Sequence, residues 1–150
     1  MHLLLKWSTD YEADTLERHR AEAKSQGSTW WSCDSTSPSK RAAPSRIDRI
    51  DEQLRREIPV FAFTYRLGDP AISASVWRAN IEEVTDSAEE AGDTFMPGGL
   101  HAFLWLRLAN FSPVEPGWVL TNLELFDSQK PLDQGALGNQ QTPLYVDIRS

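Results

Sequence analysis

The sequence has a single cysteine, Cys33, so the chain cannot form an internal disulfide. It also has no apolar run near the roughly 20 residues that a membrane-spanning helix needs. The apolar start, residues 1–5, is too short for a secretion signal and is followed at once by Lys6. These absences predict a soluble, cytoplasmic protein that needs neither an oxidising compartment nor a membrane.

The usual sequence signatures of catalysis and cofactor binding are also absent. No GxSxG elbow, P-loop or GxGxxG fingerprint occurs. The three histidines and Cys33 lack the paired spacing of metal ligands, so we expect no metal and no other cofactor. The adjacent acids at 82–83 and 89–90 belong to a charged run, which is typical of a solvated face. The sequence therefore favours a protein that is not an enzyme. A nucleophile at Cys33 or at a nearby serine, with a remote histidine, stays open, although a small buried thiol is the simpler interpretation of Cys33.

Negative charge is concentrated in one segment of the chain. Six acids between residues 82 and 93 contribute −6 to the formal net charge of −7. A Ser/Pro-rich stretch, residues 35–46, carries Lys40, Arg41 and Arg46 and no acid. Neutralisation of phosphates supplies most non-specific affinity for nucleic acids, so the overall charge disfavours such partners. The basic stretch nevertheless remains a candidate phosphate-binding surface.

Hydrophobic periodicity and turn residues predict two helices and five or six strands. The helices are expected at 11–26 and 45–58, where Ser45 is the expected N-cap and Pro59 ends the second helix. The acidic segment is expected to be a loop or a short helix. Strands are expected at 3–8, 28–33, 59–66, 72–81, 101–108 and 143–148, with one further short segment within 119–126.

A chain of 150 residues can bury one sizeable core without covalent staples, so residues 1–150 are expected to form a single domain. The order of the elements predicts an α+β domain with two helices near the N-terminus. Its sheet is expected to be curved and mostly antiparallel, with five or six strands, or to close into a small barrel. A doubly wound sheet would need helices between the later strands, where none is predicted.

The most informative stretch is the adjacent pair Trp30 and Trp31 after Gly27. Side chains alternate along a strand, so one ring fills the core while the other is free to face a pocket, and the register leaves open which. A base that stacks on such a ring gains about 1–3 kcal/mol, and polar groups then read its edge. Ser28, Ser32 and Asp34 flank the pair, Lys40 and Arg41 follow it, and Phe95 and Met96 are candidates for an opposing wall.

The order of these segments resembles the opening of YTH domains and of the related EVE domains, both of the PUA-like superfamily. The resemblance rests on Leu3-Leu4-Leu5-Lys6-Trp7-Ser8, a helix with Thr15 and His19, Thr29-Trp30-Trp31-Ser32-Cys33, and Ser39-Lys40-Arg41. Strands at 60–65, 72–79 and 103–108 match the later part in order and character. The resemblance implies a small PUA-like barrel that binds an extruded, modified base of the N6-methyladenine or 5-methylcytosine type in an aromatic cage.

Site residues follow from the resemblance by position. Trp31 matches the first cage wall, with Trp30 as its alternative, and Phe95 or Met96 stands where the family often has a second tryptophan. The residues expected to contact the base edge and to form the polar side of the pocket are Ser8, Asp10, Ser32 and Cys33. The candidate phosphate-binding residues are Lys6, Lys40, Arg41 and Arg46.

The expected function is a non-catalytic reader of modified DNA or RNA, either as a stand-alone protein or as the recognition domain of a longer one. Such readers serve modification-dependent restriction and defence systems, so a nuclease or motor is the expected further partner. Two alternatives stay open. One is an enzyme of the ASCH type that acts on RNA or nucleosides through Lys6, Asp10, Arg66 or Cys33. The other is a protein-interaction domain whose tryptophans fill the core.

Overall fold

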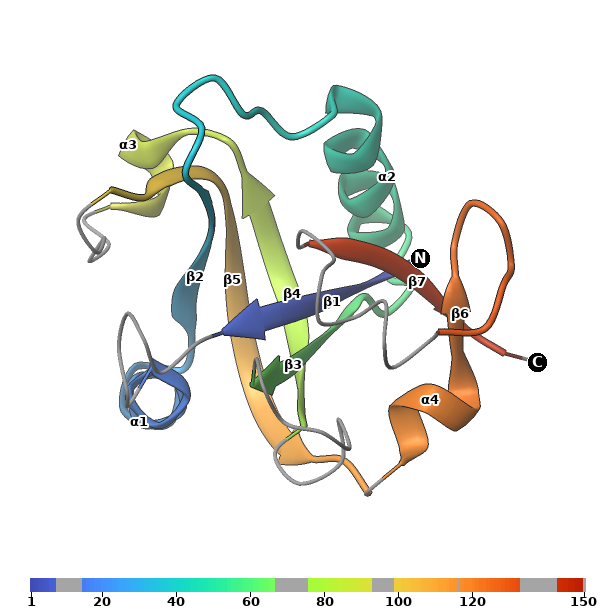
Figure 1. The fold of residues 1–150 in the computed structure, drawn as a ribbon. Coiled ribbons are helices and arrows are strands. Elements are labelled where there is room, and N and C mark those ends of the chain that lie inside the picture. The colour runs from blue at the N-terminus through green and yellow to red at the C-terminus, as the bar shows by residue number, and fades with distance from the viewer. Residues whose placement is uncertain (8–14, 67–75, 93–98, 116, 133–142, 150) are drawn as a thin grey trace.

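The computed structural model describes residues 1–7, 15–66, 76–92, 99–115, 117–132 and 143–149. These residues form an α+β structure with a seven-stranded sheet in the order β2-β5-β4-β3-β1-β7-β6 (Figure 1). Within them, no helix is long and apolar enough to cross a membrane. The strands are β1 (His2–Trp7), β2 (Thr29–Ser35), β3 (Phe61–Arg66), β4 (Trp77–Thr85), β5 (His101–Pro113), β6 (Leu123–Leu125) and β7 (Leu144–Ile148). The helices are α1 (Thr15–Gln26), α2 (Pro44–Arg55), α3 (Ala88–Ala91) and α4 (Trp118–Asn122).

The α+β class is confirmed, whereas the predicted count of five or six strands is wrong. The segment 119–126 supplies parts of both α4 and β6, and the sheet is mixed because β1 pairs with β3 in parallel. The other strand pairs are antiparallel. Leu3, Leu4 and Leu5 are all essentially inaccessible, so β1 is buried on both faces. A continuous apolar run of this kind is typical of a strand in a parallel pair.

Two predicted boundaries are also wrong. The N-cap of α2 is Ala43 rather than Ser45, and Pro44 occupies the start of the helix, where its missing N–H costs nothing. The helix ends at Arg55, so Ile58 lies beyond it and is 40% exposed. The acidic segment is not all loop or helix, because β4 continues through Glu83. In β4, Glu83 lies opposite Arg107 of β5 and its carboxylate is 3.2 Å from the guanidinium.

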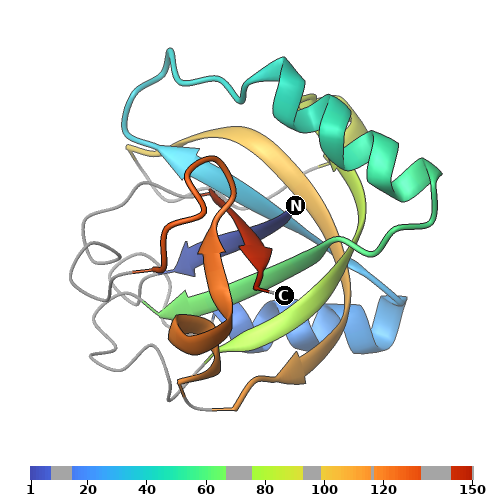
Figure 2. The ribbon, with the colours of Figure 1, turned by 90° about the vertical axis from the view of Figure 1, so that its right-hand side faces the viewer.

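Each face of the sheet packs against its own apolar cluster. The first cluster includes Leu3, Leu5, Trp31 and Leu106, and the second forms around Leu4, Phe63 and Val146 under α4. Figures 1 and 2 show α1 and α2 at opposite ends of the strand layer, with β2 beside β5 at one edge of the sheet. The edge strand β2 carries the two tryptophans, so the sheet brings them to a border that has no further strand beside it among the described residues.

Candidate functional site

The side chains of β2 divide between two environments. Thr29, Trp31 and Cys33 are buried. Trp30, Ser32 and Asp34 are partly exposed and lie on the opposite face, because side chains alternate along the strand. We call these three residues the outer row of β2. Across the ladder, Trp30 lies opposite Arg107 and Ser32 lies opposite Trp105. The residues of β5 therefore lie beside the outer row.

Trp31 belongs to the core. It is 4% exposed, and the centroid of its indole ring lies 4.6 Å from that of the His19 ring on α1. Trp31 is therefore the tryptophan that fills the core, and Trp30 lies on the outward face. A base could stack on Trp31 only after its present neighbours moved. Of the two tryptophans, Trp30 is therefore the accessible platform.

A β-bulge in β5 shapes the end of the outer row. Cys33 pairs with Leu104 but Asp34 pairs with Ala102, so Phe103 is an extra residue on β5. Phe103 and Leu104 both pack into the first cluster, as expected when a bulge turns neighbouring side chains to the same side. The alternation of β2 itself is undisturbed. Asp34 therefore stays on the face of Trp30 and Ser32.

Asp34 is the unusual polar group of this face. Its Oδ1 atom is buried, and among the described residues it has no hydrogen-bond partner. Burial raises the pKa of the Asp34 carboxyl to about 6, and a hydrogen bond from the Ser32 side chain opposes this rise. At neutral pH the group is mostly ionised and is acceptor-only. An unsatisfied buried acceptor destabilises a fold, so a hydrogen-bond donor that reached this atom would be bound favourably.

The cations predicted to bind phosphate are in different situations. Lys40 and Arg41 are exposed in the connection between β2 and α2. The Lys40 ammonium lies 5.8 Å from the centroid of the Phe103 ring, and Arg41 donates to the carbonyl oxygens of Pro38 and Lys40. Both cations are therefore accessible in the segment that follows β2.

The other two predicted phosphate ligands lie on other elements. Arg46 is ion-paired with Asp127, and its guanidinium lies 4.5 Å from the centroid of the Tyr145 ring. Arg46 thus links α2 to the β6–β7 region through its contacts with Asp127 and Tyr145. Lys6 lies on β1 opposite Tyr65, and burial lowers the pKa of its ammonium group.

Cys33 faces the core rather than a pocket. It is 5% exposed, and burial raises the pKa of its thiol far above the usual range. A thiol in this environment neither meets a base edge nor supplies a thiolate nucleophile.

Four predicted site residues, Ser8, Asp10, Phe95 and Met96, lie outside the described residues. Within the described ranges, no group of three or more His, Cys, Asp or Glu side chains is placed to hold a metal ion.

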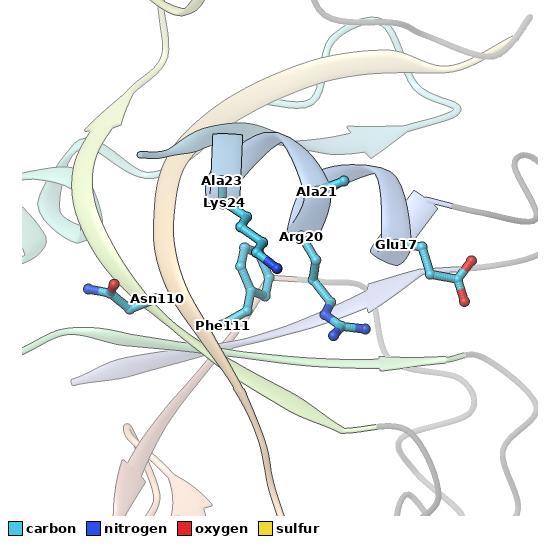
Figure 3. Close-up of a pocket in the computed structure, with 7 residues that line it drawn as sticks. All are labelled: Glu17, Arg20, Ala21, Ala23, Lys24, Asn110 and Phe111. Carbon is cyan, nitrogen blue, oxygen red and sulfur yellow. The ribbon is translucent and has the colours of Figure 1, made fainter. Parts of the chain in front are cut away.

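A groove between α1 and the end of β5 was not predicted from the sequence. Its volume is about 470 Å³. Arg20 and Lys24 extend from α1 on the side where the ring of Phe111 lies (Figure 3). Helical spacing could have placed Arg20 and Lys24 on one face of α1. Their meeting with β5 depends on tertiary packing, which no local pattern reveals. The complete lining consists of Glu17, Arg20, Ala21, Ala23, Lys24, Asn110 and Phe111.

No protein-family model matches this sequence, and no curated protein matches it.

Proposed function

We propose that this chain is a non-catalytic domain that binds a modified base of DNA or RNA against the outer row of β2. The observation that carries the proposal is the buried Asp34 Oδ1, which has no hydrogen-bond partner among the described residues. The proposal also rests on the resemblance to YTH and EVE domains. It differs from what that resemblance implies in assigning the stacking surface to Trp30 instead of Trp31.

A carboxylate in this position suits an exocyclic amino group. Asp and Glu accept hydrogen bonds from the N4 amine of cytosine, and the N6 amine of adenine is a donor of the same kind. N6-methyladenine keeps one N–H on that nitrogen, and 5-methylcytosine keeps two. A donor from the base would satisfy the Asp34 oxygen while the base ring lay against the side chain of Trp30, four residues earlier on the same face, with Ser32 between them. Lys40 and Arg41 would then meet the flanking phosphates.

We favour binding over catalysis because one candidate catalytic residue of the enzyme alternative, Cys33, is buried and has a raised pKa. A binding domain of this kind would supply recognition to a nuclease or motor carried elsewhere. The acidic segment fits this role, because negative charge weakens background affinity for unmodified strands and leaves the modification to decide binding.

The test is the fluorescence anisotropy of labelled single-stranded and duplex DNA and RNA that carry N6-methyladenine, 5-methylcytosine or no modification. We expect one modified oligonucleotide to bind at least about tenfold more tightly than its unmodified twin, roughly 1.4 kcal/mol. Asp34→Asn should remove that preference. Asp48→Asn, which makes the same charge change at an exposed position on α2, should keep it. Equal binding across the panel by the unaltered chain would refute the proposal.

A further inference from the structure

The groove between α1 and β5 is an opening that the function proposed above does not use. Its α1 side presents Arg20 and Lys24, one helical turn apart, and its β5 side presents Asn110 and Phe111 (Figure 3). The volume of about 470 Å³ lies within the range of about 300 to 1,000 Å³ that is usual for sites of small ligands. The groove is thus large enough for a single nucleotide.

The cations of the groove are free to meet an anion. The guanidinium of Arg20 lies 3.6 Å from the centroid of the Trp77 ring, which fixes its position and leaves its charge unneutralised. Neither Arg20 nor Lys24 is ion-paired with a carboxylate among the described residues. The acid of the lining, Glu17, lies at the other end of the row, beyond Arg20 (Figure 3). Two unpaired cations on one helix face stand out in a chain of net charge −7.

The β5 side of the groove offers an aromatic ring, whereas the Asn110 amide extends away from the two cations (Figure 3). Phe111 is partly buried against the first cluster and lines the groove with its ring. Its neighbour Asn110 is exposed and has φ 57°, in the left-handed region that non-glycine residues seldom adopt. Asn is among the residues that tolerate this conformation. A ring beside two cations matches two parts of a nucleotide, namely base and phosphate.

We infer that this groove holds one nucleotide of a single-stranded nucleic acid, with its phosphate between Arg20 and Lys24 and its base against Phe111. A base within a duplex has its faces covered by its neighbours, so stacking on Phe111 requires an unstacked strand. The inference rests on the proposed function, because it assigns a further nucleotide of the same strand to α1. It goes further by naming a single strand as the ligand.

The experiment measures the affinity of the full chain for labelled ten-nucleotide single strands, their duplexes and the mononucleotides AMP and CMP across a series of salt concentrations. Lys24→Gln should weaken binding of the single strand and reduce the slope of log K against log salt by about 0.7, the contribution of one phosphate contact on a single strand. Phe111→Leu keeps apolar packing while removing the ring face, and it should weaken binding about tenfold. Lys130→Gln, an exposed lysine on the β6 side, should change neither quantity.

The outcomes separate this inference from the proposed function. If Lys24→Gln and Lys130→Gln behave alike, the groove inference is overturned even where the preference for a modified base persists. Binding of duplex as tight as that of single strand overturns it as well, as does AMP or CMP binding as tightly as the strand. If Lys24 and Phe111 matter but modified and unmodified strands bind equally, the groove stands and the proposed base reader fails. Circular dichroism of each variant confirms that the fold is retained, and a variant that loses its fold is replaced by Lys24→Met or Phe111→Met.

Discussion

The Nε2 atom of His19 lies 3.1 Å from the carbonyl oxygen of Trp30. The other ring nitrogen, Nδ1, lies 2.7 Å from the carbonyl oxygen of Thr15 in the same helix, and the ring packs on Trp31. One imidazole therefore ties α1 to β2 at the residue whose side chain turns outward. The contact holds the backbone from which the Trp30 ring projects.

Substitution of His19 should remove one source of pH dependence from stability. Burial lowers the pKa of its imidazole, so the folded chain resists a proton that the unfolded chain binds. The stabilisation is present above pH 6.5, the ordinary His pKa, and is lost as the pH falls below it. We expect the difference in unfolding free energy between the unaltered chain and His19→Gln to shrink between pH 7.5 and about pH 5. Urea titrations measure it, and a difference that grows toward low pH would contradict the assignment.

Asp34→Asn should stabilise the fold at alkaline pH. The folded carboxyl has its pKa raised from 3.8 to about 6, so the folded state holds the proton more tightly than the unfolded state does. Stability from this group is therefore full below pH 3.8 and is lost as the pH rises through about 6. At pH 8 the Asp34→Asn variant should exceed the unaltered chain by up to about 3 kcal/mol of unfolding free energy, and at pH 3 by about none. Loss of stability at pH 8 would show that the carboxylate has a partner in the fold.

The same carboxyl should control the affinity for a base. Protonation replaces an acceptor with a donor, so binding of the preferred oligonucleotide should weaken as the pH falls through about 6. The pH profile of Asp34→Asn should be flat over that range, after correction for titration of the base itself. A profile in the unaltered chain that matches the variant would remove Asp34 from the site. This variant thus combines greater stability with loss of recognition, which a purely structural carboxylate would not do.

The two tryptophans of β2 should respond differently to truncation. Trp31→Ala opens a cavity next to His19 and should lower the unfolding free energy by about 3 to 5 kcal/mol. Trp30→Ala removes a partly exposed ring and should leave a folded chain that binds at least about tenfold more weakly, since a base stack contributes about 1–3 kcal/mol. Thermal unfolding and anisotropy separate the two effects. Wild-type affinity in a folded Trp30→Ala chain would exclude this ring as the platform.

The sequence predicts the opposite orientations of Trp30 and Trp31, because alternation is a local property of a strand. Which ring enters the core is decided by α1 and β5, whose contacts with β2 come from distant parts of the chain. Arg46 illustrates the same limit. Its neighbours place it in a basic stretch, but its acidic partner, Asp127, stands 81 residues later. The charge of a segment therefore does not reveal which of its cations remain available to a ligand.

The fold class follows from the spacing of apolar residues, whereas the strand partners do not. The parallel register of β1 and β3, with Leu3 opposite Ala62, leaves no local trace in either strand beyond their apolar content. The sequence does not reveal the bulge at Phe103 either, because a phenylalanine fits a regular strand as well as a bulged one. Long-range pairing and packing therefore determine both the centre of the sheet and the end of the outer row.

The parallel β1–β3 pair also has a kinetic consequence. The connection between these strands contains α1, β2 and α2, so the centre of the sheet closes only after a long loop has been ordered. The β4–β5 ladder joins strands that are neighbours in the sequence and needs a much shorter closure. We expect amides of β4 and β5 to gain protection early in refolding and those of β1 to gain it last. A chain that emerges from the ribosome N-terminus first would therefore hold its three consecutive leucines, Leu3, Leu4 and Leu5, without a strand partner until β3 had been synthesised.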